Sequence, residues 1–100
     1  GHLPSYDTQI LKAAKRKDLV SVNHRIAAFL ESYFDIIFAV NELTHPGEKR
    51  MMSYAAAHAN LLPNQFEQSL NTLLMSITAS PEILEKELRE IIVNLEGILS

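Results

Sequence analysis

The longest apolar pattern in the chain runs from residue 19 to residue 43 and repeats at the period of an α-helix. Its members alternate steps of three and four residues without a miss: Leu19, Val22, Ile26, Phe29, Tyr33, Ile36, Val40 and Leu43. A second apolar line, Leu30, Phe34 and Ile37, lies beside it in the later half. The pattern predicts one long central helix, of about 37 Å, that contacts neighbours on two sides. The residues expected to be most buried are Phe29, Tyr33, Ile36, Ile37 and Val40.

Shorter helical patterns surround this segment. Apolar residues recur at helical spacing in residues 6–14, 66–77 and 84–98, and the small residues of MMSYAAAHANLL, 51–62, predict a further helix that approaches its neighbours closely. Asp18 is expected to cap the central helix, and Asn64 with Glu67 has the spacing of a capping box. Ser80-Pro81-Glu82 combines a capping side chain with a proline at the first helical position. Because no strand-like alternation competes, the prediction is an all-α fold, an antiparallel bundle of about five helices with a long central helix.

Length and composition limit the classes of protein that remain. A chain of 100 residues with 47% hydrophobic content suits one domain, expected over residues 3–100, and Gly1-His2 resembles a remnant of an expression tag. The absence of cysteine excludes disulfides, thiolate zinc sites and cysteine nucleophiles, and it favours a cytoplasmic setting. No apolar stretch approaches the roughly 20 residues of a membrane span, and no signal segment opens the chain, so a soluble protein is expected.

Several kinds of site are excluded by spacing. Gly47 is the only glycine between residues 2 and 96, which rules out glycine-rich phosphate loops. His58 has no histidine or carboxylate three or four residues away, so no metal ligation is expected there. Asp35 shares a helical face with Glu31, Glu42 and Phe38 and is expected to face water. The sequence therefore predicts no catalytic residue, no metal and no cofactor.

Basic residues are unevenly distributed along the chain. Residues 1–50 carry seven Lys/Arg and six Asp/Glu, a net charge of +1, whereas residues 51–100 carry two and six, a net charge of −4. Lys12, Lys15, Arg16 and Lys17 form one short run, and Arg25 follows. Such a run either meets phosphate or forms a solvated helix end. The acidic overall charge and the lack of aromatic residues within the run favour the solvated end.

The segment HPGEKR, residues 45–50, separates the central helix from the next one. Pro46-Gly47 predicts a turn or a helix start, with Glu48, Lys49 and Arg50 in the first turn of the following helix. Cations there oppose the helix dipole by about 0.3–1 kcal/mol each, and a bound anion reverses that sign. Lys49 and Arg50, with His45 beside them, are therefore a candidate anion site. The alternative is that both side chains extend outward and pair with acids of the C-terminal half.

Residues 38–70, FAVNELTHPGEKRMMSYAAAHANLLPNQFEQSL, together with the long helix before them, resemble the C-terminal helical domain of a family of nucleotidyltransferase-fold proteins. In that family a long apolar helix leads into a Tyr/His-Pro-Gly-x-Lys-Arg/Trp turn, a short helix, a Leu-Pro break and another helix. The matching residues are Asn41, His45, Pro46, Gly47, Lys49, Arg50 and Leu62-Pro63. This specific part covers a third of the chain, and Arg50 stands where some relatives carry Trp.

The resemblance implies a substrate-binding or accessory domain that packs against a catalytic domain, in cis or in trans. The Gly-Ser motif and paired aspartates of nucleotidyl transfer are absent, so this chain alone is not expected to catalyse. A nucleotide or phosphate would be held by Lys49 and Arg50, with hydrogen bonds from Asn41 and His45. The alternative is a small helical interaction module or homodimer that exposes an apolar patch. The patch residues would be Phe38, Met51, Met52 and Met75.

Overall fold

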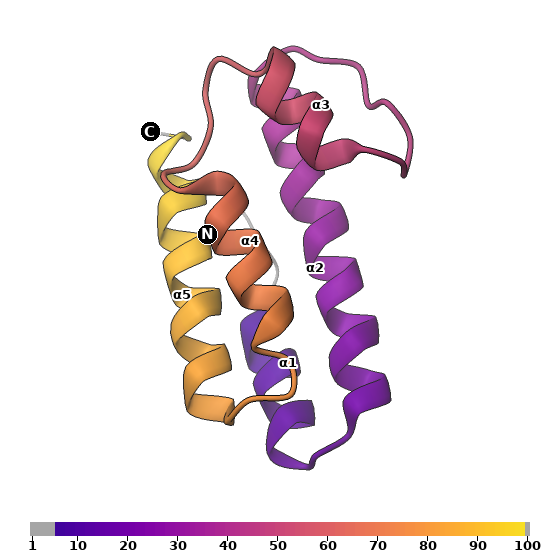
Figure 1. The fold of residues 1–100 in the computed structure, drawn as a ribbon, viewed down its shortest axis with the longest axis vertical. Coiled ribbons are helices and arrows are strands. Elements are labelled where there is room, and N and C mark those ends of the chain that lie inside the picture. Colours follow the sequence, from indigo (N-terminus) through magenta and orange to yellow (C-terminus); the bar gives the residue numbers. More distant parts are fainter. Residues whose placement is uncertain (1–5, 100) are drawn as a thin grey trace.

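The computed structural model describes residues 6–99, which form five α-helices and no strand (Figure 1). The helices are α1 (Tyr6–Lys15), α2 (Leu19–Val40), α3 (Met51–His58), α4 (Phe66–Met75) and α5 (Pro81–Gly97). The predicted all-α fold with a long central helix is confirmed. The tag remnant expected at Gly1-His2 lies outside the described residues.

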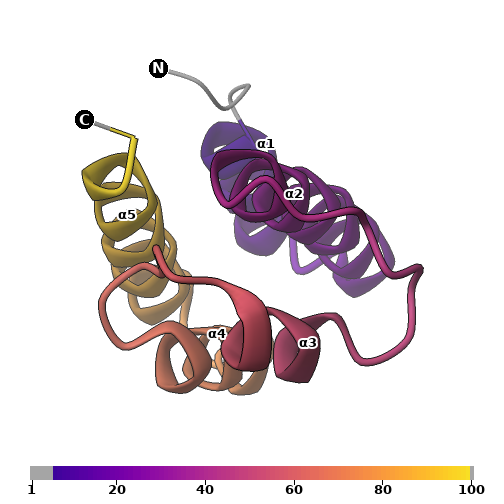
Figure 2. The ribbon, with the colours of Figure 1, turned by 90° about the horizontal axis from the view of Figure 1, so that it is seen from above.

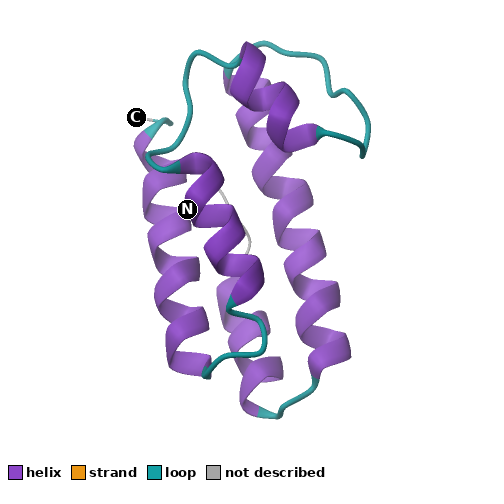
Figure 3. Cartoon of the chain, viewed as in Figure 1, coloured by secondary structure: helices purple, strands orange, loops and turns teal. Residues whose placement is uncertain are grey.

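Two antiparallel helix pairs make up the body of the fold. α1 and α2 form one pair and α4 and α5 the other, and α1 packs against both α2 and α5 (Figures 1 and 2). The short α3 lies near the C-terminal end of α2, between two loops that Figure 3 shows to be longer than the turns joining the paired helices. The loops at residues 41–50 and 59–65 therefore lie at the end of the bundle opposite the α1–α2 turn.

A chain of aromatic rings joins three of the helices. Phe29 of α2 contacts Tyr6 of α1 and Tyr33 of α2, each with ring centroids 6.1 Å apart. Tyr33 also stacks on Phe66 of α4, at 6.3 Å. Burial raises the pKa of Tyr33 well above its ordinary value, so this ring remains neutral in the core. These contacts make the middle of α2 the centre of the hydrophobic core.

The apolar pattern predicted for the central helix matches the buried residues in its middle but not at its ends. Phe29, Tyr33 and Ile37 are buried, but Leu19 is 48% exposed and Ile36 and Val40 are only half-buried. The helix ends at Val40, so Leu43 lies outside it. A straight α-helix has 3.6 residues per turn, and a strict seven-residue repeat drifts around it by about 20° per heptad. The buried line therefore runs through Ile37 instead of Ile36 and Val40.

Phe38 is buried, contrary to the prediction from the sequence. It was expected on the exposed face of Asp35, yet only 2% of its surface is accessible. The rings of His45, at 5.1 Å, and Tyr54, at 5.9 Å, both meet it edge-on. The loop after α2 folds back over this face, and helical periodicity gives no information on that. Asp35 itself is exposed, as expected.

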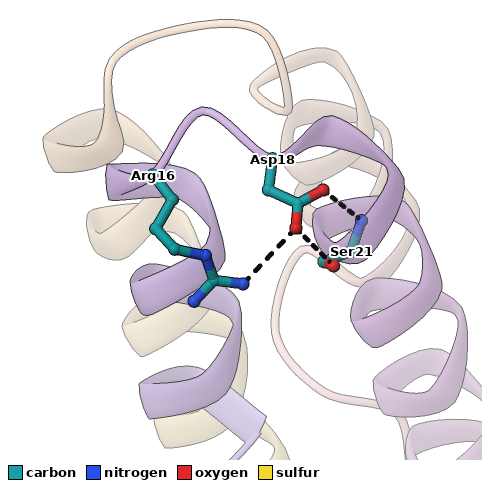
Figure 4. Close-up of polar contacts among 3 residues, drawn as sticks. All are labelled: Arg16, Asp18 and Ser21. Carbon is teal, nitrogen blue, oxygen red and sulfur yellow. Dashed lines mark hydrogen bonds and ion pairs between the residues drawn. The ribbon is translucent and has the colours of Figure 1, made fainter.

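Local capping signals predicted the starts of two helices. Asp18 accepts a hydrogen bond from the backbone N–H of Ser21 at 3.2 Å and another from the Ser21 hydroxyl at 2.7 Å (Figure 4). The Ser21 hydroxyl and then its backbone N–H, with a smaller effect of Arg16, lower the pKa of Asp18 below its ordinary value. Ser80 caps α5 in the same way, accepting from the N–H of Ile83. Both predicted caps are confirmed.

The predicted capping box at Asn64 and Glu67 does not form. The residue before α4 is Gln65, in the left-handed region at φ 54°, and no side chain caps the helix. The carbonyl of Asn64 instead accepts a long hydrogen bond, 3.5 Å, from the side-chain amide of Asn94 on α5. The left-handed Gln65 therefore separates Asn64 from the helix start, and the predicted cap is wrong.

Candidate functional site

The loop from α2 to α3 carries the four predicted site residues, Asn41, His45, Lys49 and Arg50. Gly47 has φ 97° and Arg50 has φ 61°, both in the left-handed region. The backbone therefore stays non-helical through Arg50, and α3 begins at Met51. The expectation that Lys49 and Arg50 occupy the first turn of this helix is wrong, because the Pro46-Gly47 turn extends to Arg50 before the helix starts.

Asn41 uses its whole side-chain amide to hold two chain segments together. Its Nδ2 donates to the carbonyls of Ile37 and Leu61, each at 2.8 Å, and its Oδ1 accepts from the N–H of Leu61 at 2.7 Å. These bonds join the end of α2 to the segment that follows α3. The side chain therefore fixes both ends of the loop region and has no free group directed at a ligand.

His45 lies among acidic side chains. Its Nδ1 accepts from the N–H of Gly47 at 3.0 Å, which leaves the proton of the neutral ring on Nε2, 3.7 Å from Asp35 Oδ1. His45 also borders a hollow of about 380 Å³ whose lining includes Glu31 and Glu48. Three carboxylates near one imidazole repel an anion. The structure thus places His45 in surroundings that do not suit phosphate.

Arg50 borders a neighbouring hollow, which shares Leu30 and Met51 with the one at His45. It borders an apolar groove of about 260 Å³, which we call the α2–α4 groove. The other lining residues are all apolar: Leu30 and Phe34 of α2, Met51 and Met52 of α3, and Leu70 and Leu74 of α4. Lys49 and Arg50 are exposed, and neither side chain forms an ion pair or hydrogen bond within residues 6–99. His45 and Arg50 therefore border neighbouring hollows, which share Leu30 and Met51, and neither Asn41 nor Lys49 lines either of them.

The predicted apolar patch is present only in part. Met51 and Met52 are half-buried in the α2–α4 groove, whereas Phe38 is buried and Met75, 82% exposed, lies outside the groove. Leu74, 45% exposed, also lines the groove. Its spacing with Leu70 is the only sequence signal for this surface, and the same spacing is typical of a fully covered helix face.

No cluster of three or more His, Cys, Asp or Glu residues suited to a metal ion occurs within residues 6–99. None of the helices in that range combines the length and apolar character needed to cross a bilayer. Comparison with protein-family models, curated proteins and solved structures gave no match.

Proposed function

We propose that this chain is a non-catalytic interaction module that binds an amphipathic helix of a partner protein in the α2–α4 groove. The observation that carries the proposal is the guanidinium of Arg50, unpaired within residues 6–99, at the rim of a groove whose other lining residues are all apolar. A partner helix would place apolar side chains in the groove and a carboxylate opposite Arg50. Of the described residues, none supplies that carboxylate to Arg50.

The composition of the groove suits a helical ligand. Methionine side chains are flexible and polarisable, so Met51 and Met52 adapt to the shape of an inserted side chain. Methionine and arginine are also enriched at protein interfaces relative to other surfaces. An amphipathic helix offers apolar side chains at positions i, i+3, i+4 and i+7, which is how helices occupy such grooves.

The resemblance described above suggests the partner. We propose a nucleotidyltransferase-type catalytic domain, either in the same chain or in a separate one, which this module would dock against as an accessory domain. The chain would then contribute to nucleotidyl transfer only by binding. A cytoplasmic setting is part of this proposal and rests on the absence of cysteine.

A substitution in the groove tests this proposal. The probe is a synthetic helical peptide with leucine at positions i, i+3, i+4 and i+7 and one flanking glutamate. Leu74→Glu is expected to weaken its binding by at least about tenfold, because a carboxylate would be buried against apolar side chains. Met75→Glu is the matched control, since the neighbouring side chain lies outside the groove. Isothermal titration calorimetry measures both, and equal losses would contradict the assignment of the groove.

A charge exchange tests the role of Arg50. Arg50→Glu is expected to weaken the binding of the glutamate-bearing peptide and to strengthen the binding of a version that carries lysine at the same position. If Arg50→Glu changes the affinity of both peptides equally, no carboxylate faces residue 50 and the proposed orientation of the helix is wrong.

A nucleotide or free phosphate is the second candidate ligand, and a specific observation favours it. Lys49 and Arg50 are adjacent, exposed and without charge partners in the described part of the chain. Asn41 and the Nδ1 atom of His45 are already bonded, so the two cations would bind alone. ATP at low salt should then shift the amides of residues 47–51, and Lys49→Ala with Arg50→Ala should abolish the shift. An unchanged shift in that double variant excludes this candidate.

A further inference from the structure

Three cationic side chains line one pocket at the end of the bundle opposite the α2–α3 loop. Lys12 of α1, Arg16 just after it and Arg25 of α2 line one small pocket of about 160 Å³, together with Gln9 and Ser21. The backbone N–H of Arg16 donates to the carbonyl of Lys12 at 3.2 Å, so these two residues lie one helical turn apart. The antiparallel packing of α1 and α2 adds Arg25 to them.

The stability of the fold explains this arrangement only in part. Lys12 and Arg16 lie near the negative end of the α1 dipole, which favours cations, but like charges one turn apart repel. Arg25 lies in the second turn of α2, toward the positive end of that dipole, and gains nothing from it. Among the described residues, Arg16 forms one ion pair, an exposed contact of 3.4 Å with Asp18, and Lys12 and Arg25 form none. Three positive charges therefore line one small pocket, and within residues 6–99 one carboxylate pairs with them.

We propose that this pocket binds the phosphate group of a small phosphorylated ligand. Two guanidinium groups and one ammonium group supply donors that match phosphate oxygens, and Arg binds such oxygens in pairs. The pocket is smaller than the roughly 300–1,000 Å³ of sites that enclose whole ligands, so it would hold the phosphate group and leave the remainder in solvent. Asp18 would compete with the ligand for Arg16 (Figure 4).

The neighbouring lysines provide a control within the same basic run. Lys15 and Lys17 line a different pocket, bordered by the α4–α5 turn. The run from Lys12 to Lys17 is thus divided between two surfaces of the bundle. Removing Lys15 and Lys17 changes the net charge as much as removing Lys12 and Arg25, but it leaves the proposed phosphate pocket intact.

The first test is a titration of the ¹⁵N-labelled protein with inorganic phosphate and with a nucleoside monophosphate at low salt. Amides of residues 12–16 and 21–25 are expected to shift, and Lys12→Ala with Arg25→Ala is expected to weaken binding by about tenfold or more. Lys15→Ala with Lys17→Ala is expected to change the affinity for phosphate by less than about threefold. Equal losses in the two double variants, or shifts centred on residues 47–51, would overturn the proposal.

The second test uses Asp18→Asn. Asparagine caps helices about as well as aspartate, so α2 keeps its cap while the competing charge disappears. Phosphate affinity is expected to rise by about two- to fivefold, the scale of an exposed ion pair. An unchanged or lower affinity would show that Arg16 is not shared between Asp18 and the ligand. Binding to anionic phospholipid vesicles without binding to either soluble phosphate would also overturn the proposal.

Discussion

Replacing Phe29 by alanine is expected to lower the free energy of unfolding by about 3–5 kcal/mol. The side chain is fully buried, at 0% exposure, and touches Tyr6 of α1 and Tyr33 of α2. Its removal would lose the transfer free energy of a phenyl ring, leave a cavity and separate the aromatic contacts between the two helices. The free energy of unfolding of such domains is about 5–15 kcal/mol in total, so the variant would be partly unfolded at moderate temperature.

Urea denaturation followed by circular dichroism measures this loss. Val20→Ala is the control, because Val20 is an exposed residue of the same helix and surface substitutions change stability by less than about 0.5 kcal/mol. A loss below about 1 kcal/mol for Phe29→Ala would mean that Phe29 is not in the core, and the register of α2 would be wrong.

Replacing Asn41 by alanine is expected to cost about 1–3 kcal/mol of stability. Three hydrogen bonds would be lost, and the N–H and carbonyl of Leu61 would lose their partner. Since Leu61 is exposed, water would restore part of the loss. The effect should appear as lower urea resistance and as faster hydrogen exchange at the amide of Leu61.

Asn60→Ala is the control for Asn41, because Asn60 is exposed and precedes Leu61 directly. It is expected to leave both stability and exchange near the original values. If Asn41→Ala is as stable as the unmodified chain but binds ATP more weakly, Asn41 contacts a ligand, as the sequence resemblance implies.

Sequence patterns were sufficient for the helices and for caps that depend on neighbouring residues. Asp18 and Ser80 cap as predicted because each bonds to the residue three positions later, within one turn. Asn64 fails as a cap because Gln65, in the left-handed region, stands between it and the start of α4. Phe38 was misplaced because its cover comes from a loop and from α3, which lie outside its own helix.

The arrangement of the charges was harder to predict than the fold. His45 and Arg50 are five residues apart and border two neighbouring hollows, which share Leu30 and Met51, because Gly47 and Arg50 turn the backbone between them. The sequence likewise shows the basic run but not that Arg25 completes one part of it, which depends on how α1 packs on α2. The sequence predicts a turn at Pro46-Gly47, but linear spacing does not show how far that turn extends or how α1 packs on α2.

The three methionines of the chain allow the groove to be tested in a single measurement. With the methionine methyl groups labelled with ¹³C, the leucine- and glutamate-bearing helical peptide is titrated into the protein and followed by NMR. We predict that the methyl signals of Met51 and Met52, which line the α2–α4 groove, shift in a saturable way while that of Met75 does not. Shifts confined to Met75, or no saturable shift at Met51 and Met52, would contradict the claim that this groove binds a partner helix.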